Sequence, residues 1–99
     1  METNNMTTEK NKIKVARPKH YKVIMHNDDY TSMEFVVDIL TSVFNKKLVE
    51  ATKIMIDVHK AGRGIAGIYP YDIAVTKVSI AMSKAEEEDF PFKLTIEEE

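Results

Sequence analysis

Two short stretches of the chain alternate between apolar and polar side chains, one at residues 21–26 and one at residues 92–97. A period of two is typical of a β-strand that has one face against a core. The side chains on the apolar phase of these stretches are Tyr21, Val23, Met25, Phe92, Leu94 and Ile96. A third short run, at residues 63–69, ends at Pro70, and proline suits the end of a strand better than its interior. The pattern therefore predicts three strands.

Three further segments repeat their apolar residues every three or four positions, as amphipathic helices do. The first follows Thr31-Ser32-Met33-Glu34, which fits a capping box with Thr31 as the N-cap. The second ends at Gly62, a residue suited to a left-handed C-cap. The apolar faces of the three predicted helices are Val36, Ile39, Leu40 and Val43, then Leu48, Ala51, Ile54, Met55 and Val58, then Ala74, Val78, Ala81 and Ala85.

The predicted elements follow one another as strand, helix, helix, strand, helix, strand. Three strands with three helices on one face predict the α+β class, as a two-layer sandwich with a three-stranded antiparallel sheet in the order β-α-α-β-α-β. Residues 1–19 are polar and lysine-rich, so we expect a flexible N-terminal extension there. Residues 20–99 are then expected to be the core domain, because 99 residues allow little more than one.

Composition narrows the classes of function. The formal net charge is -2, so neither nucleic acid nor a membrane is a predicted partner. The chain has no cysteine, which favours a reducing compartment and hence a cytoplasmic location. It also lacks a glycine-rich phosphate loop, a nucleophile elbow and a paired-histidine zinc motif. We therefore predict no catalytic residue, no cofactor and no metal site, and a protein that is not an enzyme.

The junction between the first predicted strand and helix is rich in oxygen acceptors. Asn27, Asp28, Asp29 and Thr31 lie there, and a carbonyl or carboxylate oxygen can bind an ammonium group, which has donors only. The same residue types are common in ordinary turns and helix caps. Composition alone favours the turn interpretation over a cation site.

His59 lies near the end of the second predicted helix, one turn after Met55 and next to Val58. Residues four apart project from the same helix face, and a methionine is well suited to the wall of a pocket. His59 can therefore form the polar edge of an apolar pocket beside Met55 and Val58. A histidine is also favoured at a helix C-terminus by its charge alone, and spacing alone favours this second interpretation.

A set of motifs extends from Pro18 to the C-terminus of the chain. The motifs are Tyr21-Lys22-Val23-Ile24, Asn27-Asp28-Asp29-Tyr30-Thr31, Met33-Glu34-Phe35-Val36-Val37, Ala51, Met55, Val58-His59, Gly62, Gly67, Ala74, Thr76-Lys77-Val78, Pro91 and Leu94. As a set they closely resemble the ClpS adaptor family, whose members bind degradation signals made of a free α-amino group on an N-terminal Leu, Phe, Tyr or Trp. The resemblance implies N-degron polypeptides as ligands. It also implies a partner, the N-terminal domain of a ClpA- or ClpC-type AAA+ unfoldase of the Clp protease, whose substrate choice the adaptor modulates.

The resemblance also assigns roles to residues of this chain. Asn27, Asp28 and His59 are expected to hold the ammonium group of the ligand. The residues expected around its first side chain and at the rim are Asp29, Thr31, Met33, Val36, Met55, Val58 and Phe92. Asp72 and Lys77 match the family's contact with the unfoldase, and the N-terminal extension is expected to engage the unfoldase during hand-over. Phe92 stands where the family commonly has leucine.

Two other functions remain open at this point. A small hydrolase could use Asp28 and His59, but it would need a metal or a further nucleophile. A ribosomal-stalk-like interaction module could share the fold, since fold does not fix function. That module would have no use for acceptors that converge with His59 on one pocket.

Overall fold

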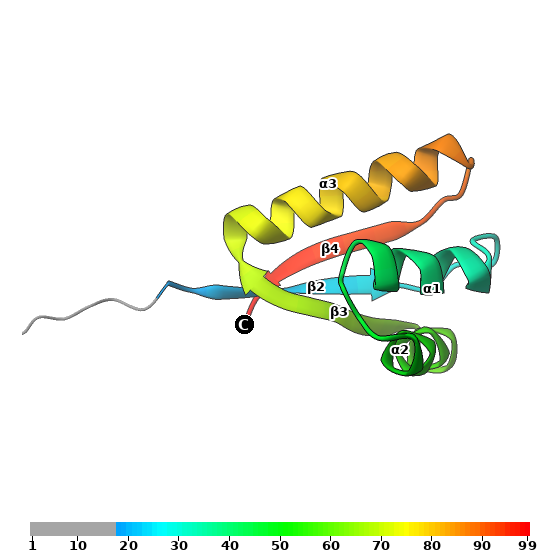
Figure 1. The fold of residues 1–99 in the computed structure, drawn as a ribbon, viewed down its shortest axis with the longest axis horizontal. Coiled ribbons are helices and arrows are strands. Elements are labelled where there is room, and N and C mark those ends of the chain that lie inside the picture. The colour runs from blue at the N-terminus through cyan, green and yellow to red at the C-terminus, as the bar shows by residue number, and fades with distance from the viewer. Residues whose placement is uncertain (1–17) are drawn as a thin grey trace, which may run out of the picture.

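The computed structural model describes residues 18–99. Its elements are β2 (His20–His26), α1 (Met33–Ser42), α2 (Leu48–Ala61), β3 (Arg63–Pro70), α3 (Tyr71–Glu87) and β4 (Lys93–Glu98) (Figure 1). The α+β class and the order β-α-α-β-α-β are thus confirmed. The predicted extension falls almost wholly on residues 1–17, which lie outside the described range. Its flexibility and the boundary at residue 19 stay predictions.

The three strands form one sheet with β2 in the centre. The strand order is β3-β2-β4, and β2 is antiparallel to both neighbours. Val23 and Met25 share the face of β2 that the alternation predicted to be apolar, and both are 0% exposed. Ile24 points to the opposite face, where its cross-strand neighbours are Ile65 and Thr95.

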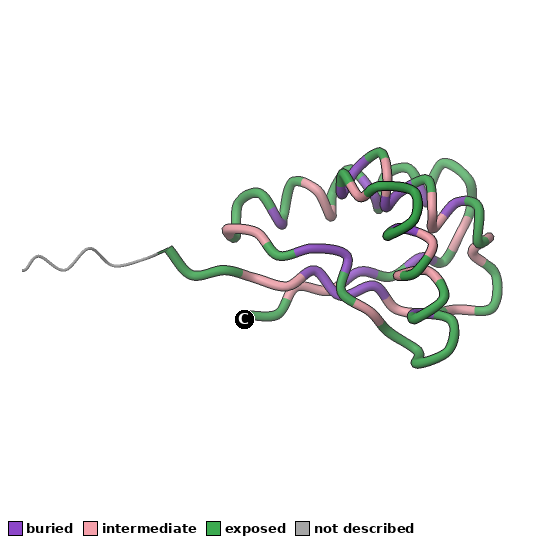
Figure 2. The backbone as a smooth tube through the Cα atoms, turned by 60° about the horizontal axis from the view of Figure 1, so that its bottom comes forward, coloured by how far each residue is buried: buried purple, intermediate pink, exposed green. Residues whose placement is uncertain are grey.

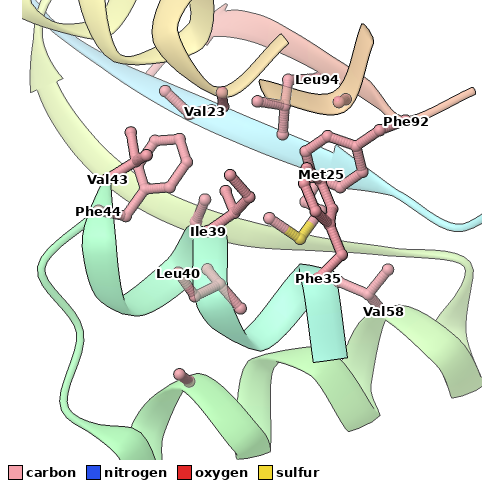
Figure 3. Close-up of a cluster of buried hydrophobic side chains, with 14 of the residues drawn as sticks. Val23, Met25, Phe35, Ile39, Leu40, Val43, Phe44, Val58, Phe92 and Leu94 are labelled. Carbon is pink, nitrogen blue, oxygen red and sulfur yellow. The ribbon is translucent and has the colours of Figure 1, made fainter. Parts of the chain in front are cut away.

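A single core lies between that face of the sheet and the three helices (Figures 2 and 3). In Figure 3, Phe35 and Ile39 of α1 point toward Val23 and Met25 of β2. The buried residues of this core are Val23, Met25, Phe35, Ile39, Leu40, Val43, Phe44, Ala51, Val58, Ala66, Ala74, Ala81, Ala85, Phe92 and Leu94. Small alanines recur where α3 faces the sheet, which lets this helix pack close to β2 and β4. Among the described helices, none combines the length and apolar character that a membrane crossing requires.

Two local predictions are wrong. Ser32, not Thr31, is the N-cap of α1, and its Oγ accepts a hydrogen bond from the Phe35 N–H at 3.1 Å. Thr31 belongs to the preceding turn instead, because Asp28 binds both its N–H and its hydroxyl. Leu48 was assigned to the buried face of α2, but it is 66% exposed. It begins α2 at the outer edge of the α1–α2 contact, beside a surface groove rather than over the sheet.

Candidate functional site

A cavity of about 200 Å³ opens between the β2–α1 turn, the start of α1 and the C-terminal half of α2. Pockets for drug-sized ligands measure about 300–1,000 Å³, so this cavity suits a single amino-acid side chain. Its lining residues are Asn27, Asp28, Asp29, Thr31, Met33, Val36, Met55, Val58 and His59. The structure therefore brings together all the residues predicted around the ligand's first residue except Phe92.

Asp28 organises the turn that forms the polar side of the cavity. Its Oδ1 accepts hydrogen bonds from the N–H groups of Tyr30 and Thr31, at 2.8 and 2.7 Å. Its Oδ2 accepts the Thr31 hydroxyl at 2.7 Å. Burial raises the pKa of this carboxyl, but the bonds from Thr31 and Tyr30 outweigh it and leave the pKa below its ordinary value. Asp28 is therefore a carboxylate at neutral pH, with a fixed orientation.

The turn is joined to the end of α2 by backbone hydrogen bonds. The Asn27 N–H donates to the Gly62 carbonyl at 2.9 Å, and the Gly62 N–H donates to the Val58 carbonyl at 2.9 Å. Gly62 has φ of 89° as the C-cap of α2, a left-handed conformation in which glycine is favoured. This cap places the C-terminus of α2 beside the turn. That helix end carries partial negative charge and favours a bound cation.

The apolar wall of the cavity comes from both helices. Met33 and Val36 contribute from α1, and Met55 and Val58 contribute from α2. Val58 is buried because β3 approaches α2 closely at Gly64, where an added Cβ would lie 2.9 Å from Val58 Cγ2. Sequence reasoning missed this role of Gly64, although a glycine inside a strand often marks a close approach.

His59 adds a ring nitrogen to the lining of the cavity from the end of α2. It lies in the last turn of α2, and its side chain is exposed. A neutral imidazole has one acceptor nitrogen. Together with the oxygens of Asn27 and Asp28, it can therefore surround a small cationic donor at the mouth, with apolar groups behind it.

The structure does not bring Phe92 to this cavity. Phe92 is 3% exposed in the core, where its ring meets that of Phe35 edge to face with centroids 5.5 Å apart (Figure 3). It stands just before β4 on the side that faces the helices, and Phe35 lies in the same core cluster. Phe92 also lines a separate hollow between α3 and residues 90–92.

The two residues predicted to contact an unfoldase both lie on α3, far along the chain from the cavity. Asp72 is exposed in the first turn of the helix. Lys77 is half-buried, and its Nζ donates to the Val43 carbonyl at 2.7 Å and to Asn45 Oδ1 at 3.0 Å. Lys77 also lies 5.3 Å from the centroid of the Tyr69 ring. Its ammonium group therefore donates a hydrogen bond to a backbone carbonyl at the C-terminal end of α1, a role that the sequence does not reveal.

These features define the class of protein. The described residues form a small α+β domain with a side-chain-sized cavity whose lining combines apolar side chains with hydrogen-bond acceptors. Within residues 18–99, no group of three His, Cys, Asp or Glu side chains is placed to hold a metal ion. Such a lining can accommodate a ligand that has an apolar group next to a cationic donor.

Comparison with known proteins identifies the family. Residues 16–95 match the family model of the ATP-dependent Clp protease adaptor protein ClpS. The ClpS adapter of Clostridium acetobutylicum is 57% identical over 89 residues, which are 90% of this chain and 88% of the relative. The adapter of Wolinella succinogenes is 53% identical over 90% of this chain and 87% of its own. The chain therefore belongs to the ClpS family of Clp protease adaptors.

A solved structure agrees with this assignment. Agrobacterium tumefaciens ClpS2 bound to L-phenylalaninamide matches the fold with a TM-score of 0.80 and 38% identity. The match covers 84% of this chain and 100% of that one. The ligand of that protein combines a free α-amino group with an aromatic side chain.

Proposed function

We propose that this adaptor binds polypeptides through a free N-terminal Leu, Phe, Tyr or Trp and delivers them to a ClpA- or ClpC-type AAA+ unfoldase. One observation carries the proposal: the acceptors of the β2–α1 turn and His59 converge on an apolar cavity of about 200 Å³. An N-terminal residue presents a charged donor and a side chain on the same carbon, and this cavity can receive both.

The ammonium group binds at the mouth. A carboxylate has about four acceptor positions, and three of those of Asp28 are taken by Tyr30 and Thr31. The remaining position is held in a fixed direction by the other three bonds. The side-chain oxygen of Asn27 and a ring nitrogen of His59 supply two further acceptors, which matches the three donors of an ammonium group.

The first side chain enters the apolar part of the cavity between Met33, Val36, Met55 and Val58. Burying a large apolar side chain contributes about 1.5–3 kcal/mol. An internal residue can offer the side chain but not the charge, and a lysine side chain offers the charge without the apolar group beside it. The phenylalaninamide held by the Agrobacterium relative has both features, which supports this mode of binding.

The surface of α3 around Asp72 is the proposed contact with the unfoldase. Asp72 and Lys77 are five residues apart, which separates them by about 140° around a helix axis. The Lys77 ammonium also holds the end of α1. We therefore assign the direct charge contact to exposed Asp72, with Lys77 at the edge of the interface.

Fluorescence anisotropy with short labelled peptides tests the ligand. Peptides that begin with Leu, Phe, Tyr or Trp are expected to bind, and N-acetylation is expected to abolish binding because it removes the charge. A peptide with the same composition but an N-terminal Ser and an internal Phe is the control. Equal affinity for free and acetylated peptides would contradict the proposal. Delivery is tested separately, by degradation of a Phe-initiated reporter in the presence of Asp72→Ala.

A further inference from the structure

A second hollow of about 470 Å³ adjoins the cavity and lies along the surface between α1 and α2. Met33 and Met55 line both hollows, so the two adjoin at these side chains. Beyond these methionines, Val37 of α1 and Leu48 of α2 give the groove an apolar floor and side. Two of its apolar side chains are well exposed, Met33 at 52% and Leu48 at 66%.

We propose that this groove receives the third residue of the bound polypeptide and selects an apolar side chain there. The inference rests on the proposed function, because the first residue must occupy the cavity for the chain to continue into the groove. The occupant is the substrate itself, since the groove begins at the two methionines that border the cavity.

The position of the third residue follows from simple geometry. Met33 and Val37 are four residues apart on α1, which corresponds to about 6 Å along the helix. Two residues of an extended peptide advance about 6.6–7 Å. Alternate side chains of an extended strand point to the same side. For a peptide that runs along α1 from Met33 toward Val37 with its first side chain in the cavity, the third side chain would face the protein near Val37, and the second and fourth would point away.

The charges around the groove add to the specificity. Glu34 and Asp38 line it on the α1 side, and both are exposed. A carboxylate at the third position of the ligand would face these two like charges at short range. The groove therefore suits an uncharged apolar residue, and an acidic residue is the least favourable occupant.

A leucine scan measures this directly. The parent peptide is Phe followed by alanines and a fluorescent label at the C-terminus, with a single Leu placed at position 2, 3 or 4. Leu at position 3 is expected to raise affinity about fivefold over the alanine parent, as partial burial of its additional methylenes predicts. Leu at positions 2 and 4 is expected to change affinity less than twofold.

Two variants show whether the groove causes the difference. Leu48→Ala removes the exposed side chain from the groove and keeps good helix propensity. Val49→Ala is the matched control, because Val49 is the next residue of α2, is 85% exposed and does not line the groove. The gain from Leu at position 3 is expected to disappear in Leu48→Ala and to persist in Val49→Ala. Affinity for the alanine parent should stay the same in both variants.

The outcomes separate this inference from the proposed function. If free peptides bind, acetylated peptides do not, and position 3 shows no preference, the groove inference is overturned while the first-residue site stands. The inference also fails if the preference survives Leu48→Ala. If free and acetylated peptides bind equally, or neither binds, the proposed function falls and the groove inference falls with it.

Discussion

Asp28→Asn separates the two tasks of Asp28. In the wild-type turn, Oδ1 accepts two backbone N–H groups and Oδ2 accepts the Thr31 hydroxyl. An asparagine can keep its carbonyl oxygen toward the two N–H groups and turn its amide toward the Thr31 hydroxyl, which can also accept. The turn should therefore survive. The negative charge and the acceptor that faces the ligand are lost.

The expected loss of affinity follows from the one charge-assisted hydrogen bond that is removed. Such bonds contribute about 1.5–3 kcal/mol, so their loss should increase the dissociation constant roughly 10- to 150-fold. Asp29→Asn is the matched control, because Asp29 lines the same cavity and loses the same charge. Asp29 is exposed, so solvent and salt screen its charge. Its substitution should therefore lower peptide affinity by a few-fold at most.

The assay is anisotropy titration of a Phe-initiated peptide against both variants at fixed salt. Urea unfolding of each variant shows whether the turn remains intact. Equal losses of affinity in the two variants would refute the reasoning, since the effect would then be a general change of charge. An Asp28→Asn protein that binds as tightly as wild type would show that Asp28 serves only the turn.

Three further predictions concern Met33 in the cavity wall, Lys77 at the end of α1, and His26 on β2. Met33→Ala should admit peptides that begin with Ile or Val and raise their affinity roughly tenfold in the same titration. A β-branched residue needs width near its Cα, and relief of overpacking is worth about 1–3 kcal/mol. An unchanged preference would mean that Met33 serves only packing. Lys77→Met should lower the free energy of unfolding by about 1.5 kcal/mol in urea, because its ammonium donates to the Val43 carbonyl and to a neighbouring amide oxygen. Lys84→Met, two turns along the same helix, should be nearly neutral, and similar losses in both would count against a specific contact. Burial, with two nearby cations, lowers the pKa of His26 from 6.5, so the fold favours the neutral ring and stability should fall as pH decreases below about 6.5. In a plot of the urea unfolding midpoint against pH, His26→Gln should flatten the slope below about pH 6.5. An unchanged slope would mean that another group causes the loss of stability.

Much of the fold is predictable because burial imposes a period on the sequence. The alternation of Val23 and Met25 identifies the buried face of the central strand, and Gly62 identifies the end of α2 through its positive φ. Local chemistry is harder to read where two residues compete for one role. Thr31 and Ser32 are both good N-caps, and the choice depends on Asp28, which binds Thr31 into the turn.

The candidate site is predictable only in part. The residues of the turn and of α2 line one cavity as expected, and their roles toward a ligand stay predictions. The resemblance implied a place for Phe92 beside the ligand, but the structure puts its ring against Phe35 in the core. The alternation of the strand indicates only that Phe92 faces the helices, not which helix residue it meets. Leu48 fits a helical apolar period as well as any core residue. Its exposure depends on where α2 begins relative to α1, which no local pattern encodes.

The hydrogen bond from the Asn27 N–H to the Gly62 carbonyl joins two segments that are remote in sequence. Ligand affinity is therefore linked to the fraction of molecules in which this contact is closed, since an observed dissociation constant equals the intrinsic one divided by the competent fraction. A substitution at Gly62 that favours the open turn should weaken binding even though Gly62 does not line the cavity. By the same linkage, a peptide at 100 times its dissociation constant should stabilise the folded domain by about 2.7 kcal/mol. Thermal denaturation thus becomes a measure of which N-terminal residues the closed cavity accepts.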